Sequence, residues 1–294
     1  MIQLGNVATS IEIQIQILKN RGMTIDIPEA KVCEVLLDIG YYRLGFYWHP
    51  YQMNQSHQFK VGTKFSNVLA LYYLDVDLRH TLHKYLNRIE VNFRTKLVYA
   101  VSNHYPHYPN WFSESSIVKT AFLNNLAKIY NEKFKSRNRV IKLHHAKYLH
   151  HNFAPAWKTL EYFTFGTNLN LYRNIINEDV KKQISLTYQI ENTKKFQVII
   201  GAMLELRNAC AHGDVLFDFN LPLGVPNFSV FQLSGSDRQS IFACYQVLRF
   251  LLSSISMNRK NQLDSEVHAL LHAYRGNTEI NNIITNNMKF RIEM

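Results

Sequence analysis

The sequence predicts an all-α protein. Glycine and proline are scarce, at 11 and 7 of 294 residues, and the apolar side chains recur every three to four positions. There is no convincing run of alternating strand residues and no strand–helix–strand pattern. The only β-structure that we expect is a small hairpin. The chain is 47% hydrophobic and 19% charged, a composition that excludes a disordered protein.

Three long segments carry the helical pattern. The clearest spans about 68–101, where one apolar stripe is formed by Leu71, Leu74, Leu78, Leu82, Tyr85, Ile89, Phe93 and Leu97. The second spans about 194–212, with an inward face formed by Phe196, Ile199, Ile200, Met203, Leu206 and Cys210. The third spans about 238–257. Shorter helices are predicted at 11–20, 29–37, 117–134, 156–163 and 169–176.

Two turn-rich stretches, 45–66 and the Pro- and aromatic-rich 102–116, interrupt the helical pattern. We therefore expect a short N-terminal helical unit over 1–60, with an aromatic-rich segment. A helical domain should follow over 61–260, containing a basic insert at about 117–150. Residues 261–294 are expected to form a helical tail.

The charge is concentrated in one part of the chain. Lys and Arg exceed Asp and Glu by 33 to 22, and residues 119–147, here called the basic segment, hold eight basic residues against one acidic residue. Such an excess favours a polyanionic partner, although a run of charges is as often a solvated face. The candidate RNA-binding cations are Lys128, Lys133, Lys135, Arg137, Arg139, Lys142 and Lys147.

The aromatic stretch 41–48 offers a second candidate surface. Tyr42 and Arg43 could stack on unpaired bases, but aromatic residues this dense more often pack in a core or at a boundary. We keep both interpretations, with packing the stronger one.

Patterns for metals, cofactors and membranes are missing. No glycine-rich nucleotide motif occurs, the three cysteines are far apart, and the four histidines within 144–151 lack the i, i+4 spacing of a helical zinc site. Asp75 and Asp77 point about 200° apart on a helix, which favours structural roles for both. We expect no metal, no cofactor and no membrane contact. Without a signal peptide or an apolar run of membrane-spanning length, the expected location is the cytoplasm.

The segment Leu206–Gly213 (LRNACAHG) is different because its polar residues are not needed for packing. Gly213 can adopt the left-handed conformation that ends a helix, which places His212 at the helix C-terminus, where a protonated imidazole is favoured. Arg207 is a permanent forked cation suited to phosphate, and Asn208 shares a helical face with His212. The alternative is that these side chains only close off the end of the helix.

LRNACAH resembles the R-x4-H signature of the HEPN superfamily of ribonucleases and RNA-binding domains. The surrounding chain is similar to the bacterial Abi (abortive infection) family of the AbiD/AbiF type. The resemblance rests on four ordered stretches: IGYYRLGFYWHPYQ at 39–52, the stretch 71–97, FAPAWKTLEYFTFGTNLNLYRNI at 153–175 and LRNACAHGDVLFD at 206–218.

The resemblance implies a HEPN-like helical bundle, a homodimer, and a role in phage defence or in a toxin–antitoxin system. It also implies metal-independent RNA cleavage, with Arg207, His212 and Asn208 as the catalytic candidates. One His212 would deprotonate the ribose 2′-OH, a second would protonate the leaving 5′-oxygen, and Arg207 would stabilise the phosphorane. Two alternatives are a catalytically silent module that holds a small structured RNA, and a protein-interaction subunit.

Helical geometry makes a shared site attractive. Arg207 and His212 lie five residues apart, which separates them by about 7.5 Å along the axis and about 140° around it. The two side chains therefore converge poorly within one chain, whereas a two-fold axis near the helix end would bring two copies of the motif together.

Overall fold

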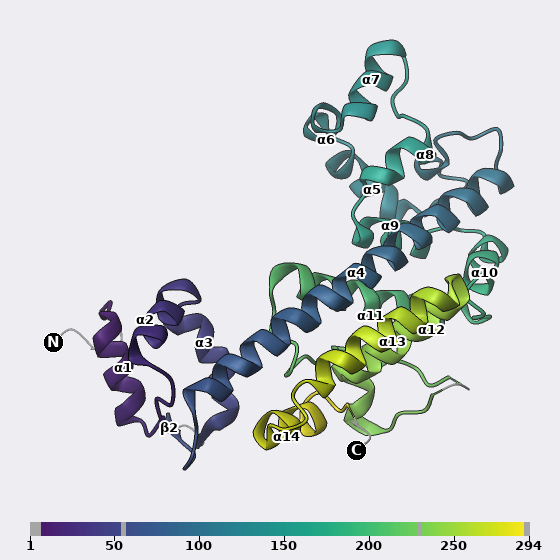
Figure 1. Ribbon diagram of the computed structural model, residues 1–294. Helices are drawn as coiled ribbons and strands as arrows, with labels where there is room; N and C mark the ends of the chain where they lie inside the picture. Colours follow the sequence, from purple (N-terminus) through teal and green to yellow (C-terminus); the bar gives the residue numbers. More distant parts are fainter. Residues whose placement is uncertain (1–6, 54–56, 229–230, 291–294) are drawn as a thin grey trace. The chain divides into compact units, whose positions relative to one another are not determined.

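The computed structural model describes residues 7–53, 57–228 and 231–290, and this part of the chain is overwhelmingly helical (Figure 1). Its one sheet is an antiparallel pair of two-residue strands, β1 (Gln52–Met53) and β2 (Gln58–Phe59). The predicted all-α fold is therefore confirmed. None of the described helices combines the length and the apolar character needed to cross a lipid bilayer.

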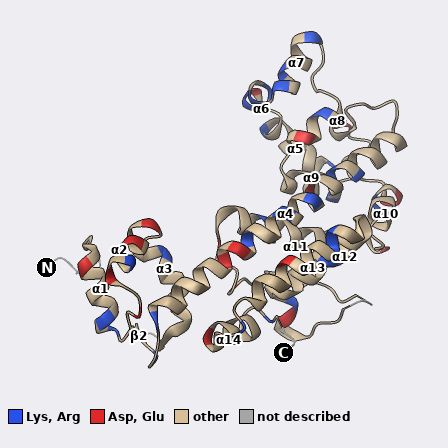
Figure 2. Cartoon of the chain, viewed as in Figure 1, with Lys and Arg blue, Asp and Glu red and all other residues tan. Residues whose placement is uncertain are grey.

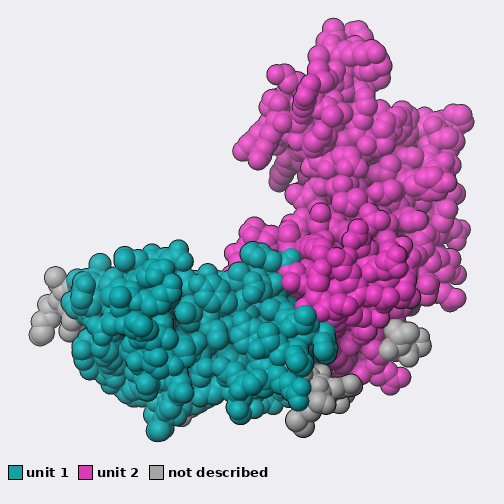
Figure 3. All heavy atoms as spheres, viewed as in Figure 1, with its two compact units in different colours: residues 1–80, 215–218, 267–294 teal, residues 81–214, 219–266 magenta. Residues whose placement is uncertain are grey.

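The chain divides into two compact units (Figure 3). Unit 1 comprises residues 1–80, 215–218 and 267–294, and unit 2 comprises residues 81–214 and 219–266. Two helices, α4 (Phe65–His104) and α13 (Met257–His272), contribute residues to both units.

Unit 1 is assembled from short helices. Apart from its parts of α4 and α13, these are α1 (Ile11–Asn20), α2 (Glu29–Asp38), α3 (Tyr41–Trp48), the 3-10 turn η2 (His49–Tyr51) and α14 (Thr278–Asn286). The N-termini of α1 and α14 are capped by the side chains of Ser10 and Asn277, which accept hydrogen bonds from backbone N–H groups inside each helix.

A buried aspartate organises the centre of unit 1. Asp75 of α4 is 1% exposed and accepts hydrogen bonds from the Tyr47 hydroxyl at 2.9 Å and from the backbone N–H groups of Leu216 and Phe217 at 2.8 and 3.0 Å. Arg79, one helical turn further along, forms an ion pair with the same carboxylate. Asp75 thus ties residues 215–218 to α4, which is the structural role expected from its spacing.

Unit 2 surrounds α11 (Thr193–His212), which packs against α9 (Phe165–Arg173), α10 (Glu178–Leu186) and α12 (Ile241–Ile255). The remaining elements are η4 (Trp111–Ser113), α5 (Thr120–Ile129), α6 (Glu132–Arg137), α7 (Arg139–Lys147), α8 (Ala156–Thr159), η5 (Leu160–Tyr162) and η6 (Gly235–Gln239). The ring of Phe93 on α4 lies 5.8–6.1 Å from the rings of Phe165, Tyr172 and Phe196, which joins α4, α9 and α11 in one aromatic core.

The long predicted helices form, and all eight residues of the predicted stripe on α4 are buried. The single helix predicted over 117–134 is wrong, because the chain breaks into α5 and α6. The Asn131 side chain accepts a hydrogen bond from the Phe134 N–H and starts a new helix. The helix predicted over 238–257 starts instead at Ile241, because Ser240 caps it through the Ala243 N–H.

Candidate functional site

The R-x4-H motif occupies the last turns of α11. This helix begins at an Asn192 cap and buries Phe196, Ile199, Ile200, Met203, Leu206 and Cys210, the inward face predicted from the sequence. It ends at Gly213, whose φ of 75° and ψ of 28° are left-handed, as predicted. His212 is therefore the last helical residue, and its side chain is exposed.

Glu90 of α4 holds the Arg207 guanidinium. Arg207 Nε donates to Glu90 Oε2 at 3.0 Å and Nη2 donates to Oε1 at 3.1 Å, a bidentate arrangement. The two side chains are 22% and 15% exposed, so the pair is fixed in place yet still reached by solvent.

Asn208 completes the support of Arg207. Its Oδ1 accepts a hydrogen bond from Arg207 Nη1 at 3.1 Å. Asn208 and His212 are one turn apart on α11, but the Asn208 amide oxygen accepts its hydrogen bond from Arg207. A guanidinium has five N–H donors, and three are used by Glu90 and Asn208, which leaves two for an anion.

The His212 imidazole has no hydrogen-bond or ion-pair partner among the described residues. The structure thus brings Arg207, Asn208 and Glu90 together within unit 2, and no contact joins Arg207 to His212 in the described part of this chain. Such a site can present a fixed cation and a solvated proton-transfer group to an anionic ligand.

The basic segment forms α5, α6 and α7, which pack around a cluster of aromatic side chains. The Tyr130 ring lies 5.0 Å from Phe134 and 5.1 Å from Phe153, and the Tyr130 hydroxyl accepts from the Ala154 N–H at 2.9 Å. The cations lie along α6 and α7 and at the end of α5 (Figure 2). Exposed side chains are those of Lys119, just before α5, and of Lys128, Lys133, Arg137, Arg139, Lys142 and Lys147.

Lys135 differs from the other cations of the basic segment. Its ammonium lies 2.8 Å from Glu132 Oε1 and 5.9 Å from the centre of the Tyr130 ring, and its side chain is 29% exposed. The hydrogen bond from Lys135 holds the pKa of Glu132 below its ordinary value. Lys135 is thus partly neutralised within its own helix.

Three of the four histidines within 144–151 contact Tyr130 or one another. His145 Nε2 lies 2.8 Å from the Tyr130 hydroxyl, and His144 Nε2 lies 3.3 Å from His151 Nδ1. Desolvation lowers the pKa values of His144 and His145, so burial works against their protonation. No group of three or more potential metal ligands occurs among the residues that the structure places.

Tyr42 and Arg43 belong to α3 in unit 1. Tyr42 is 83% exposed, whereas Tyr47 and Trp48 on the same helix are 0% and 4% exposed. Arg43 donates to the Tyr47 hydroxyl at 3.0 Å and lies 5.8 Å from the Phe46 ring centre. The stretch therefore both packs and presents one exposed ring, and a role for Tyr42 in stacking stays a prediction.

Sequence reasoning missed Glu90, which lies 117 positions from its partner. Glu90 stood in the sequence as one of several charged residues on the polar face of a long helix. Only the packing of α4 against α11 identifies which carboxylate meets the motif. The sequence held only a weak signal for this contact, namely an acidic residue on one predicted helix and an arginine on another.

Comparison with known proteins places the chain in a family. No curated protein and no solved structure matches it. The family model described as Abi-like protein matches residues 34–218, a span that runs from α2 to just beyond the R-x4-H motif. This chain therefore belongs to the Abi-like protein family, and it is related to abortive infection as the sequence resemblance implied.

Proposed function

We propose that this protein is an RNA-binding endoribonuclease of the HEPN type that cuts RNA without a metal ion in bacterial phage defence or a toxin–antitoxin system. The observation that carries the proposal is that the last turns of α11 present both a fixed arginine and an exposed histidine. Neither side chain belongs to the buried apolar face of that helix. Membership of the Abi-like family supports the biological setting.

The proposed reaction is a transesterification. A His212 imidazole removes the proton of the ribose 2′-OH, and the 2′-oxygen attacks the adjacent phosphorus. The bond from phosphorus to the 5′-oxygen breaks, and a second imidazole, in its protonated form, gives that oxygen a proton. The products are a 2′,3′-cyclic phosphate and a 5′-hydroxyl end. Arg207 stabilises the charge of the phosphorane with the two N–H groups that Glu90 and Asn208 leave available.

Two imidazoles are needed, and each chain supplies one His212. We therefore propose a homodimer in which two α11 ends face each other across a two-fold axis. A covalently linked dimer with one His212→Ala protomer tests this arrangement. A shared site should lower the cleavage rate well below half of the wild-type value, whereas independent sites would keep half of it.

The basic segment is the proposed RNA-binding surface, because six of its cations are exposed on α5, α6 and α7. Reversing Lys133, Arg137, Arg139 and Lys142 to Glu should weaken RNA binding strongly. It should also reduce the slope of log affinity against log salt by about 3, since each phosphate contact on a single strand contributes about 0.7. An unchanged RNA affinity and an unchanged salt slope would show that the basic segment does not contact RNA.

The decisive experiment compares His212→Ala with His272→Ala. His272 is a matched control, because it is also an exposed histidine at the last position of a helix. With total bacterial RNA as substrate and EDTA present, His212→Ala should lower the cleavage rate by about 10²–10⁴-fold, while His272→Ala should not. Activity that requires added magnesium would exclude this mechanism.

A second candidate function is a silent module that holds a small structured RNA. One observation favours it: three of the five N–H donors of Arg207 are already occupied. The same assay distinguishes the two functions. RNA that co-purifies with the wild-type protein, binds through the basic segment and is never cleaved would select the silent module.

A further inference from the structure

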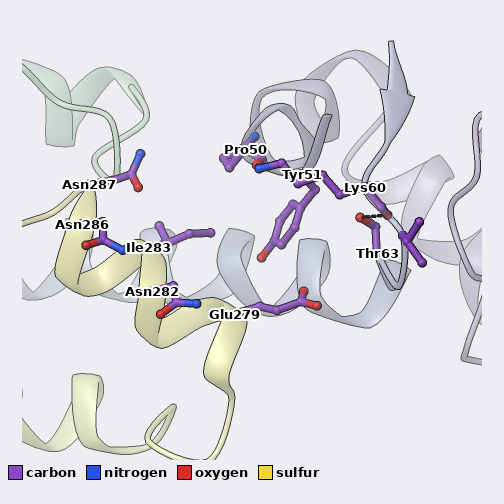
Figure 4. Close-up of a pocket in the computed structure, with 10 residues that line it drawn as sticks. Pro50, Tyr51, Lys60, Thr63, Glu279, Asn282, Ile283, Asn286 and Asn287 are labelled. Carbon is purple, nitrogen blue, oxygen red and sulfur yellow. Dashed lines mark hydrogen bonds between the residues drawn. The ribbon is translucent and has the colours of Figure 1, made fainter. Parts of the chain in front are cut away.

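A cavity of about 490 Å³ lies within unit 1, between α14 and the segment that joins α3 to α4 (Figure 4). Its volume is in the range of about 300–1,000 Å³ that is typical of small-molecule sites. Its walls come from Pro50, Tyr51 and Lys60 on one side and from α14 on the other. Helix α14 lies outside the part of the chain that matches the Abi-like family.

The Tyr51 hydroxyl is the first sign of a ligand. The tyrosine is 6% exposed, and its buried hydroxyl oxygen has no hydrogen-bond partner in the described part of the chain. Figure 4 shows the ring directed toward α14. Burial raises the pKa of Tyr51, so the hydroxyl keeps its proton. A buried, unpaired hydroxyl costs about 1–3 kcal/mol, and a ligand that accepts its hydrogen bond would recover this.

Three amides provide the second sign. Asn282, Asn286 and Asn287 line the cavity, and their side chains have no hydrogen-bond partners among the described residues. Asn282 and Asn286 are four residues apart on α14 and therefore share one face of the helix. Each amide offers a carbonyl acceptor and two N–H donors, which suits a ligand whose donors and acceptors alternate.

The charged groups at the cavity are already engaged. Lys60 Nζ donates to the Pro50 carbonyl at 2.8 Å, and Glu279 Oε2 accepts from the Asn67 amide at 2.6 Å. One cation and one anion also cancel, so the lining favours a neutral ligand over a phosphate or a carboxylate. The Tyr51 ring, Pro50 and Ile283 supply apolar walls for a flat molecule.

We propose that this cavity binds a single nucleobase. A flat heterocycle with alternating donors and acceptors matches the apolar walls, the free amides and the Tyr51 hydroxyl together. Asparagine amides read base edges in this way, and a base removed from its stack is commonly held between apolar and aromatic side chains. The base comes either from a free nucleoside or from an unpaired position of an RNA. The site does not depend on cleavage by Arg207 and His212.

The test uses the full-length His212→Ala protein, so that cleavage cannot affect the result. Adenosine, guanosine, cytidine and uridine are titrated by calorimetry, with ribose and inorganic phosphate as controls. At least one nucleoside should bind with 1:1 stoichiometry, and neither control should compete with it. If no nucleoside binds, or if ribose competes equally, the proposal is wrong.

Substitutions then locate the bound base. Tyr51→Phe should weaken nucleoside binding about tenfold through one lost hydrogen bond, without lowering the melting temperature. Asn282→Ala should also weaken binding, whereas Thr285→Ala, an exposed neighbour on α14 that does not line the cavity, should leave it unchanged. Equal affinity in all three variants would overturn the assignment.

A short unstructured RNA with one abasic position separates the two sources of the base. If the base belongs to an RNA, the intact RNA should bind more tightly than the nucleoside, and the abasic RNA should lose the part of the affinity that is sensitive to Tyr51→Phe. If the abasic position has no effect and nucleosides still bind, the ligand is a free nucleoside. Neither result bears on the ribonuclease proposal, which the cleavage assay tests separately.

Discussion

The Asp75–Arg79 pair of unit 1 and the Glu90–Arg207 pair of unit 2 both involve α4, but their environments differ. In unit 1, Arg79 pairs with Asp75, and the two side chains are 8% and 1% exposed. In unit 2, Arg207 pairs with Glu90, and the exposures are 22% and 15%. The chemistry of the two pairs is the same, but solvent reaches only the second to an appreciable extent.

The hydrogen bonds explain this difference. Asp75 accepts from Tyr47, Leu216 and Phe217 as well as from Arg79, so its carboxylate is saturated and sealed inside unit 1. Arg207 is fixed by Glu90 and Asn208, yet two of its N–H groups remain for a ligand. A saturated, buried pair serves the fold, whereas a fixed but accessible pair is suited to bind an anion.

Among substitutions in these two pairs, the largest expected effect is on catalysis. Arg207→Ala should lower the RNA cleavage rate by about 10²–10³-fold, because it removes the donor that stabilises the phosphorane. The free energy of unfolding should fall by only about 1–2 kcal/mol, between the values of exposed and buried ion pairs. Parallel cleavage and urea-unfolding measurements check this, with the exposed Arg275→Ala as control. An unchanged cleavage rate would mean that Arg207 has only a structural role.

Loss of the buried Asp75–Arg79 pair should instead act mainly on the stability of the fold. Asp75→Ala leaves Arg79 buried without its counter-ion and leaves the N–H groups of Leu216 and Phe217 unpaired. We expect a loss of about 3–5 kcal/mol in the free energy of unfolding, measured by urea denaturation. Asp77→Ala, two residues further along α4 and exposed, is the matched control and should change it little. Equal effects of the two substitutions would contradict the structural role of Asp75.

Most of the fold could be predicted because long helices have a strong local signal. The stripe on α4, the inward face of α11 and the left-handed Gly213 all follow from spacing and from one glycine. The short helices predicted at 11–20 and 29–37 form as α1 and α2, but others were missed because few residues carry their periodicity. Helix α3 is an aromatic run with an internal glycine, and α10 has only nine residues.

The candidate site was predicted only in part. The motif located Arg207, Asn208 and His212, but spacing alone suggested that Asn208 lies with His212. In the structure Asn208 bonds to Arg207 because the guanidinium, held by Glu90, lies within reach of its amide oxygen. Contacts across 117 residues have no local signature, and the Tyr51 cavity is invisible to the sequence for the same reason.

Glu90→Gln sharpens the comparison by keeping the shape of the pair and removing its charge. The amide can accept one hydrogen bond from Arg207 but no longer forms the charged bidentate pair. We expect the cleavage rate constant kcat to fall about tenfold and KM to stay unchanged or to decrease, since a negative charge near the RNA is removed. Steady-state kinetics measure this split. A raised KM with normal kcat would mean that Glu90 acts in RNA binding and does not position Arg207.

The smallest expected effect concerns Asn208. Asn208→Ala removes one hydrogen bond from a guanidinium that Glu90 still holds, so the cleavage rate should fall by about 2–10-fold. Asn208→Asp separates two roles for this side chain, because a carboxylate keeps the acceptor that Arg207 uses and loses the two N–H donors of the amide. If Asn208 only positions Arg207, Asn208→Asp should retain more cleavage activity than Asn208→Ala, with an unchanged KM. If the amide N–H groups instead contact the RNA phosphate, Asn208→Asp should be the more damaging change and should raise KM, because it places a negative charge against the backbone.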